Sequence, residues 1–214
     1  YSSALYVSEY ELSTYMEEMI NAFRAYADVK RISLTYESNF RYMNTWLDKD
    51  KMDSILKNLI SNALKYTPEG GSVHIYTAET EDYWSVEVKD TGIGIPSSEQ
   101  KKLFKIHFRG SNAINSKVTG SGIGLLLVWK LVHLHKGKIN FTSTEGKGSC
   151  IKVTFPKGEK PYRKAIHSPK PGSEKVAYAE SGVPKNVTPN IAYDATKQKQ
   201  QQNSDLPKIL IVED

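Results

Sequence analysis

Apolar side chains recur at helical spacing in three parts of the chain. Residues 9–28 place a group of them on one side of a helix: Leu12, Tyr15, Met16, Met19, Ile20, Phe23 and Tyr26. A second helix is predicted to begin at the capping residue Asp53 and to end near Tyr66, before the Pro- and Gly-containing residues 67–71. The apolar run that starts at Leu125 predicts a third helix, which extends to about His135.

Between these helices, apolar and polar residues alternate in the way that is typical of strands. Strands are predicted over residues 31–36, 44–47, 73–77, 84–88, 138–144 and 150–155. Residues 79–82 and 145–148 are predicted to join neighbouring strands as hairpins. Helices that alternate with hairpins indicate a layered α/β sandwich with a mixed sheet.

The character of the chain changes after Pro156. Residues 157–206 are dominated by Pro, Lys, Ser, Asn and Gln, and such a segment buries too little apolar surface to offset the entropy of ordering it. We therefore expect a flexible linker there. Residues 207–214 contain four consecutive aliphatic side chains and end on Glu213 and Asp214, which is typical of a buried parallel strand with carboxylates at its C-terminal end.

Composition narrows the function classes. Hydrophobic residues make up 39% of the chain, enough for a core, and the net charge of +5 points only weakly to an anionic partner. No basic run is interleaved with aromatic residues as in a single-strand binding groove, so nucleic acid is not an expected partner. The single cysteine, Cys150, excludes an intramolecular disulfide framework and a cysteine-rich zinc site.

Two glycine-rich turns carry the strongest chemical signal. The first runs from Asp90 to Pro96, and the second, from Thr119 to Leu125, leads directly into the third predicted helix. Glycine lets the backbone approach a ligand closely, and backbone N–H groups at the start of a helix bind phosphate. Two such turns in one chain favour a nucleotide as the ligand.

A polar stripe on the second predicted helix supports the same interpretation. Asn58, Asn62, Lys65 and Tyr66 lie at positions i, i+4, i+7 and i+8, beside the broad apolar face of that helix. An Asn oxygen is a hard ligand that suits Mg²⁺, while the Lys ammonium and the Tyr hydroxyl donate hydrogen bonds to phosphate oxygens. The stripe therefore predicts a surface for Mg²⁺ and nucleotide phosphates.

These segments, taken together, resemble the ATP-binding domain of sensor histidine kinases. Residues 58–67 resemble the N box of that family, residues 90–96 its G1 box, residues 103–109 its F box and residues 120–125 its G2 box. Their order and spacing also agree, over about residues 31–156. The resemblance implies the Bergerat ATP-binding fold, an α/β (α+β) two-layer sandwich in which three helices cover a mixed, mostly antiparallel sheet, with an ATP lid over residues 97–118.

The resemblance also implies roles for individual residues, with ATP and Mg²⁺ as ligands. Asp90 would accept a hydrogen bond from the adenine amino group, Asn58 would hold Mg²⁺, and Lys65 and Arg109 would stabilise charge on the phosphates. The catalytic set is then Asn58, Lys65 and Arg109. The further nucleotide contacts that we expect are Asn62, Tyr66, Gly92, Gly94, Ile95, Phe104, Gly120, Ser121, Gly122, Gly124 and Leu125.

The same resemblance distinguishes phosphotransfer from hydrolysis. ATPases of the wider Bergerat group carry a glutamate base where this chain has Asn58, and an amide cannot accept a proton at neutral pH. The family's acceptor is a histidine on a dimerisation domain, but this sequence has no histidine before His74. We therefore interpret residues 1–28 as a helix from or adjoining that missing domain and residues 29–156 as the catalytic domain, unable to autophosphorylate alone.

Residues 207–214 resemble the first strand of a response-regulator receiver domain. Glu213 and Asp214 would be the acidic pair of such a domain, and the whole protein would be a hybrid kinase that relays phosphate to a receiver aspartate. We expect the full-length protein to be a homodimer. The family implies that this part is the cytoplasmic domain of a sensor anchored in the inner membrane.

Two other functions stay open at this point. One is an ATPase clamp, in which ATP closes the lid and drives dimerisation, although Asn58 argues against it. The other is a non-enzymatic interaction module that keeps the fold without binding nucleotide, although the intact Asp90 and glycines argue against that.

Overall fold

The computed structural model describes residues 4–104 and 122–167 of the chain. The chain divides into two compact units, Tyr1–Lys175 and Val176–Asp214, and all described residues belong to the first. In chain order the elements are β1 (Tyr6–Glu11), α1 (Leu12–Val29), β2 (Ser33–Ser38), β3 (Asn44–Leu47), α2 (Lys49–Tyr66), β4 (Ser72–Glu79), β5 (Tyr83–Asp90), the 3₁₀ turn η1 (Gln100–Lys102), α4 (Gly124–Leu134), β6 (Lys138–Thr144), β7 (Gly148–Pro156), the 3₁₀ turn η2 (Lys160–Tyr162) and β8 (Ile166–His167).

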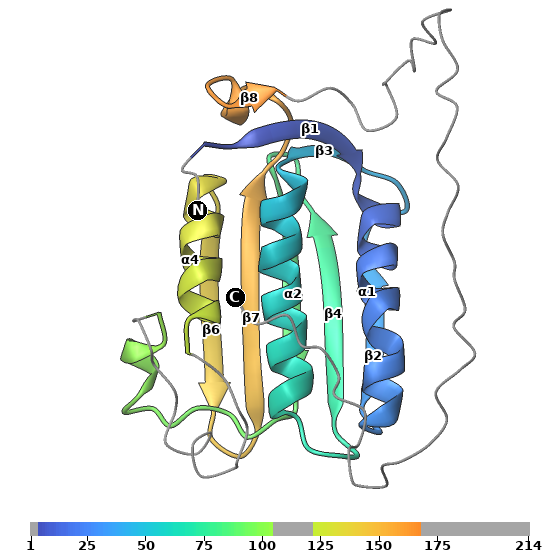
Figure 1. Ribbon diagram of the computed structural model, residues 1–214, viewed down its shortest axis with the longest axis vertical. Helices are drawn as coiled ribbons and strands as arrows, with labels where there is room; N and C mark the ends of the chain where they lie inside the picture. Colours follow the sequence, from blue (N-terminus) through green and yellow to red (C-terminus); the bar gives the residue numbers. More distant parts are fainter. Residues whose placement is uncertain (1–3, 105–121, 168–214) are drawn as a thin grey trace, which may run out of the picture. The chain divides into compact units, whose positions relative to one another are not determined.

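A five-stranded sheet forms one layer, and three helices form the other. The strand order is β2-β4-β5-β7-β6, with β2 and β4 parallel and every other neighbouring pair antiparallel. Helices α1, α2 and α4 lie side by side over the same face of the sheet (Figure 1). The predicted two-layer sandwich with a mixed, mostly antiparallel sheet is confirmed.

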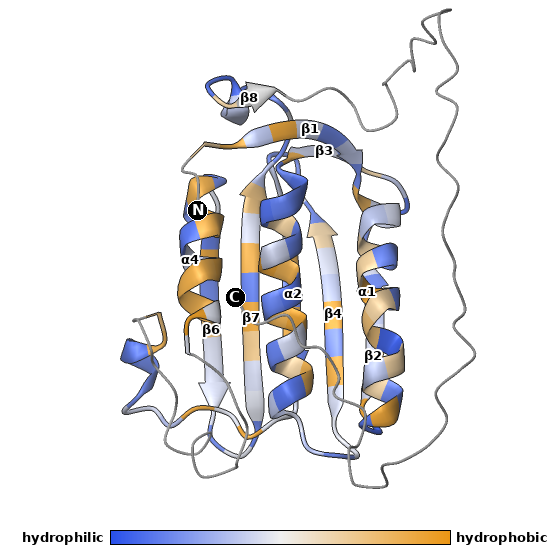
Figure 2. Cartoon of the chain, in the orientation of Figure 1, coloured by the Kyte–Doolittle hydropathy of each residue, from blue (hydrophilic) through white to orange (hydrophobic). Residues whose placement is uncertain are grey.

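The core lies between these layers. Strands β4, β5 and β7 alternate, so every second side chain is buried against the helices, among them Val73, Ile75, Val86, Val88, Val153 and Phe155. Helix α2 contributes a broad buried face, and α4 is predominantly apolar along its length (Figure 2). Each fully buried aliphatic side chain stabilises the fold by about 2 kcal/mol, which holds the helices in place over the sheet.

The N-terminal region differs from the prediction of a helix over residues 9–28. Helix α1 begins at Leu12, because the Glu11 carboxylate accepts hydrogen bonds from the backbone N–H groups of Ser13 (2.9 Å) and Thr14 (2.8 Å). Residues Tyr6–Glu11 form β1 instead, the central strand of a small sheet with the order β3-β1-β8. Helix α1 shares the hydrophobic core with α2 and the large sheet.

The second helix has its N-cap five residues earlier than predicted. Asp48, not Asp53, is its N-cap, and its Oδ1 accepts from the Lys51 backbone N–H at 3.2 Å. Asp53 lies inside the helix, where it accepts a hydrogen bond from the Tyr15 hydroxyl at 2.7 Å. Both aspartates fit the capping pattern, and long-range contacts distinguish them, since Asp48 also accepts from the Tyr6 backbone N–H at 2.9 Å.

Residues 157–167 are folded, although the sequence predicted a linker from residue 157. Strand β8 pairs with β1 in parallel, with Tyr6 opposite Ile166 and Val7 opposite His167. Tyr162 is buried in a second, smaller cluster with Leu5 and Val7. The rest of the predicted linker, residues 168–206, and the predicted strand 207–214 lie outside the described residues.

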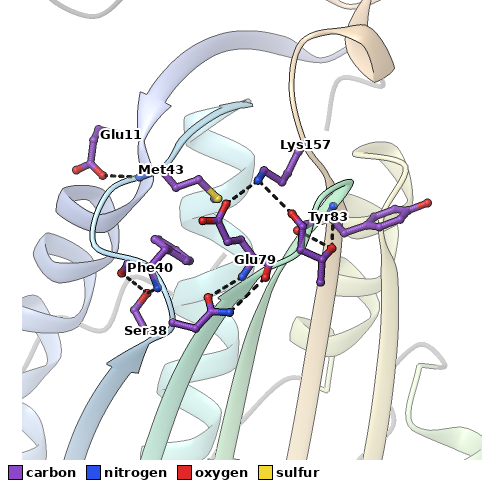
Figure 3. A network of polar contacts seen from close by, with 9 residues as sticks. Glu11, Ser38, Phe40, Met43, Glu79, Tyr83 and Lys157 are labelled. Atoms are coloured by element: carbon purple, nitrogen blue, oxygen red, sulfur yellow. Dashed lines mark hydrogen bonds and ion pairs between the residues drawn. The ribbon is translucent and has the colours of Figure 1, made fainter.

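A network of polar contacts fixes the end of β7 (Figure 3). The Lys157 ammonium forms an ion pair with Glu79 (2.6 Å) and donates to the Thr80 carbonyl (3.1 Å) in the β4–β5 turn. The Asn39 side chain bonds both backbone groups of Glu79 and so extends the pairing of β2 with β4. The Lys157 contacts hold the residue after β7 against the β4–β5 turn.

Within residues 4–104 and 122–167, no helix has the length and apolar character needed to cross a membrane.

Candidate nucleotide-binding site

The predicted site residues of α2 occupy its C-terminal half. Asn58, Asn62, Lys65 and Tyr66 are all partly exposed, beside buried neighbours such as Leu59 and Ala63. The end of the helix is tied down, because the Lys30 ammonium donates to the Leu64 carbonyl at 2.9 Å and Tyr66 O accepts from the Ile93 backbone N–H at 3.1 Å. The polar stripe is thus a fixed edge that runs towards the glycine turn after β5.

Asn58 lies against the beginning of α4. Its Nδ2 donates to the Ser54 carbonyl at 2.8 Å, and this hydrogen bond turns Oδ1 towards Gly124. A Cβ at position 124 would collide with that oxygen, so glycine at this position leaves room for the Asn58 side chain beside α4. The amide oxygen of Asn58 and the first turn of α4 therefore share one small region, as a site for Mg²⁺ and phosphate requires.

Asp90 ends β5 and holds two neighbouring segments. Its Oδ1 accepts from the backbone N–H of Gly92 at 2.8 Å and from that of Ser149 at 3.2 Å. Within residues 4–104 and 122–167, no hydrogen bond reaches Oδ2. Burial raises the pKa of the Asp90 carboxyl, against these two hydrogen bonds, which lower it. The carboxylate is thus partly desolvated, with one oxygen held by two backbone N–H groups and the other left as an acceptor for a ligand.

The glycines after Asp90 allow the loop to lie flat against its neighbours. A Cβ on Gly92 would come within 2.5 Å of the Tyr66 carbonyl oxygen at the end of α2. Gly94 has φ +62° and leaves no room for a side chain beside the Thr144 carbonyl. The loop is further joined to the β6–β7 hairpin by the Gly146 N–H, which donates to Ile93 O at 2.8 Å.

Some of the remaining predicted site residues are described by the structure, and others lie outside the described ranges. Phe104 is partly exposed just after η1, Leu125 packs against the core from the first turn of α4, and Gly122 has φ +74° ahead of that helix. Arg109, Gly120 and Ser121 lie outside the described residues, as does most of the predicted lid. Lys65 and Tyr66 contact one another, with the Lys65 Nζ 5.6 Å from the centre of the Tyr66 ring.

Three polar residues at this end of the sheet were not predicted from the sequence. Ser143 and Ser149 form a hydroxyl pair on β6 and β7 at 2.9 Å, and Gln100 of η1 donates to Ile95 O and Ser143 O, both at 3.0 Å. A serine in a strand or a glutamine in a turn is common, so the pattern alone gave no signal for them. Only the folded structure brings Ser143, Ser149 and Gln100 together, beside Asp90 and the loop that follows it.

All of these groups lie at one end of the domain. The end of α2, the beginning of α4 and the beginning of β7 meet there, away from β1 and β3 (Figure 1). Among the described residues, no cluster of His, Cys, Asp and Glu could hold a metal ion by itself. A cation here would need Asn58 together with oxygens from a ligand, which suits Mg²⁺ because this ion keeps phosphates and waters in its coordination shell.

Residues 47–159 match a family model described as histidine kinase-, DNA gyrase B-, and HSP90-like ATPase. Among curated proteins, the sensor histidine kinase WalK of Bacillus subtilis is 44% identical over 112 residues, 51% of this chain and 18% of WalK. The circadian input-output histidine kinase CikA of Synechococcus elongatus is 36% identical over 156 residues, 72% of this chain and 21% of CikA. The matched part therefore spans about a fifth of the length of these relatives.

Solved structures share the fold at low identity. A nucleotide-free catalytic domain of the histidine kinase ThkA is 24% identical, with a TM-score of 0.63 over 72% of this chain and 99% of that chain. Full-length ShkA in complex with AMPPNP is 20% identical, with a TM-score of 0.63 over 73% of this chain and 33% of that chain.

Proposed function

Because the chain belongs to the histidine kinase-, DNA gyrase B- and HSP90-like ATPase family, we propose that it binds ATP between α2, α4 and the Asp90 loop and serves as the catalytic domain of a sensor histidine kinase. It transfers the γ-phosphate to a histidine on a separate domain. The observation that carries this proposal is that one end of the domain holds both a fixed Asp90 carboxylate and an amide, Asn58, beside the start of α4.

Asp90 recognises the base in this proposal. Its Oδ1 is occupied by two backbone N–H groups, while Oδ2 accepts from the exocyclic amino group of adenine. Guanine has a carbonyl at the corresponding position, which would face a carboxylate oxygen without a proton between them. A site that offers only a hydrogen-bond acceptor at this position binds guanine nucleotides much more weakly than adenine nucleotides.

The phosphate end uses α2 and α4. Asn58 Oδ1 holds Mg²⁺, which neutralises charge on the phosphates when it is bound, while Asn62, Lys65 and Tyr66 donate to phosphate oxygens. The backbone N–H groups that follow Gly122 add donors at the start of α4. Arg109, Gly120 and Ser121 complete this set as expectations from the sequence.

The acceptor histidine comes from outside the described residues. His135 is buried at the end of α4, and His133 hydrogen-bonds the Trp129 carbonyl on the same helix. His74 pairs with Thr35 Oγ1 across β2 and β4. None of these three lies at the start of α4. In this proposal the acceptor histidine therefore belongs to a separate phosphoacceptor domain, and the whole protein is a homodimer that also contains a receiver domain.

Attachment to an inner membrane, with this domain on the cytoplasmic side, is part of the same proposal and rests on the family alone. The ATPase clamp is the competing function. It predicts repeated phosphate release by the chain, which the amide at position 58 does not support, because no base activates water there.

The test is a calorimetric titration with ATP, with and without Mg²⁺, of the wild-type chain, Asp90→Asn and the control Asp82→Asn. Asp82 is an exposed aspartate in the β4–β5 turn, at the opposite end of β5. We expect the wild type and Asp82→Asn to bind and Asp90→Asn to lose binding. Equal binding by all three would refute the role of Asp90.

The kinase step needs a second measurement. Radiolabelled ATP is supplied to the chain together with the isolated dimerisation domain of a related histidine kinase, and acid-labile phosphohistidine is measured alongside free phosphate. Phosphohistidine without sustained phosphate release supports the kinase, whereas sustained release alone supports the clamp.

A further inference from the structure

A side-chain latch holds the loop that follows Asp90 and Gly92. The Ile95 backbone N–H donates to Ser143 Oγ at 2.8 Å, and its carbonyl accepts from Gln100 Nε2 at 3.0 Å. The second N–H of Gln100 reaches Ser143 O, also at 3.0 Å. Ile95, Ser143 and Gln100 thus form a closed ring of three hydrogen bonds, which joins the Asp90 loop, the end of β6 and η1.

The hydrogen-bonding capacity of Ser143 is used completely. A serine hydroxyl has one proton and two lone pairs. Gly148 O, at 3.0 Å, has no proton of its own, so Ser143 donates to it, and the hydroxyl accepts from Ile95 N–H and from the Ser149 hydroxyl at 2.9 Å. This fixes the direction of the Ser149 hydroxyl on the residue whose N–H binds Asp90 Oδ1.

The loop needs such support because of its own composition. Gly92 and Gly94 give the backbone wide freedom, which costs entropy when the loop is ordered around a ligand. Ile95 lies outside any strand or helix, so side chains supply both of its hydrogen-bond partners. Without them the Asp90 side of the pocket would have to be ordered by the nucleotide.

We propose that Ser143 and Gln100 are positioning residues for nucleotide binding, which hold the loop after Asp90 in its binding conformation before the nucleotide arrives. They act on the base side of the site, so their loss weakens ADP and ATP equally and leaves the rate of phosphotransfer at saturating ATP unchanged. This inference rests on the proposed function for its ligand, but the latch itself is tested without one.

The binding test titrates the full 214-residue chain with ADP and with ATP in the presence of Mg²⁺. Ser143→Ala and Gln100→Glu, which removes the amide donor, are each expected to weaken both nucleotides by about tenfold. Ser143→Thr keeps the hydroxyl and is expected to restore binding. Thr142→Ala, at the exposed neighbouring position of β6, is the matched control and should bind like the wild type.

Hydrogen exchange distinguishes a local loss of the latch from a general loss of stability, because a general loss would speed exchange throughout the sheet. In Ser143→Ala, the Ile95 amide should exchange at least tenfold faster, while the amides of the β4–β5 ladder keep their wild-type rates. Should Ser143→Ala fail to fold, Gln100→Glu, which leaves the sheet intact, decides the binding question.

The outcomes separate the two proposals. Absence of ADP binding by the wild type would refute the proposed function, and the Ile95 exchange rate would still test the latch. Wild-type affinity in both Ser143→Ala and Gln100→Glu, with normal binding by the wild type, would overturn the positioning role. A loss confined to ATP would also overturn it, because it would place the effect at the phosphates.

Discussion

The backbone N–H of Asp48 donates to Nε2 of the buried His135 at 3.4 Å, which joins the start of α2 to the end of α4. His135 Nδ1 lies 2.9 Å from the Leu131 carbonyl and therefore carries the proton. The ring is neutral in this arrangement, and the Tyr162 hydroxyl donates to the His135 carbonyl at 3.2 Å. The two helices that border the candidate nucleotide site at one end are thus connected to each other at the opposite end.

Stability should fall below neutral pH because of His135. Burial lowers the pKa of the His135 imidazole below 6.5, with the Leu131 carbonyl and Asp48 opposing the shift and Lys51 adding to it. As the pH falls below 6.5, the His135 side chain binds a proton in the unfolded state but stays neutral in the folded state. The free energy of unfolding then declines, by up to about 1.4 kcal/mol per pH unit.

Urea unfolding between pH 8 and pH 5 measures this effect. His135→Gln removes the titrating ring, so its stability should be nearly independent of pH over that range, whatever its absolute value. The acidic groups act lower: partial burial works to raise the pKa of Glu11, but the hydrogen bonds from Thr14 and Ser13 lower it to about 2. Its contribution, present above pH 4.5, is lost as the pH falls from 4.5 towards 2.

Tyr162 should stabilise the domain although it lies beyond Pro156. Tyr162→Ala removes a ring that is 2% exposed and packs near His135, and it should cost about 3 to 5 kcal/mol. Tyr162→Phe removes only the hydroxyl and should cost about 1 kcal/mol. Thermal unfolding checks both, with Tyr83→Ala, an exposed tyrosine in β5, as the control. Equal stability of Tyr162→Ala and the wild type would show that residues 157–167 are not part of the folded unit.

Gly124→Ala should disturb the contact between α4 and Asn58. The added methyl group would collide with Asn58 Oδ1, so either the Asn58 side chain must turn away or the first turn of α4 must move. We expect ADP binding in Mg²⁺ to weaken at least tenfold and the free energy of unfolding to fall by about 1 to 3 kcal/mol. Gly158→Ala places a methyl group in open space outside the candidate site, at φ +75°, so it can lose stability through backbone strain but should keep the ADP affinity of the wild type. Similar ADP affinities in the two variants would contradict the close packing at Asn58.

Asn58→Ala should remove the dependence of binding on Mg²⁺. The wild type is expected to bind ADP more tightly when Mg²⁺ is present, because the amide oxygen shares the ion with the phosphates. In the variant, titrations with and without Mg²⁺ should give affinities within about threefold of each other. Asp50→Ala, which truncates an exposed side chain in the first turn of the same helix, is the control and should keep the full effect of Mg²⁺. A full Mg²⁺ effect in Asn58→Ala would assign the ion to other ligands.

The sequence predicted those parts of the fold that depend on local pattern. The polar stripe from Asn58 to Tyr66 follows from helical spacing, and the Asp90 turn follows from its glycines. Both can therefore be predicted from the sequence alone. The N-cap of α2 was misplaced because Asp48 and Asp53 carry the same local signal, and the contact of Asp53 with Tyr15 is tertiary.

Long-range pairing explains what was missed. Strand β1 exists because it pairs with β3 and with β8, and Tyr6 lies opposite Ile166, at the far end of the described chain. No local pattern in residues 6–11 predicts a partner strand so distant in the sequence. The latch was missed for the same reason, since Gln100 and Ser143 meet only when β6 lies beside the Asp90 loop.

The pairing of β1 with β8 also brings the two ends of the described fold together. Tyr6 lies opposite Ile166, so the first and last strands of the described residues are neighbours. The candidate nucleotide site lies at the other end of α2 and α4 (Figure 1). Substitutions in β1 or β8 can therefore test the stability of the domain without touching the residues of the candidate site.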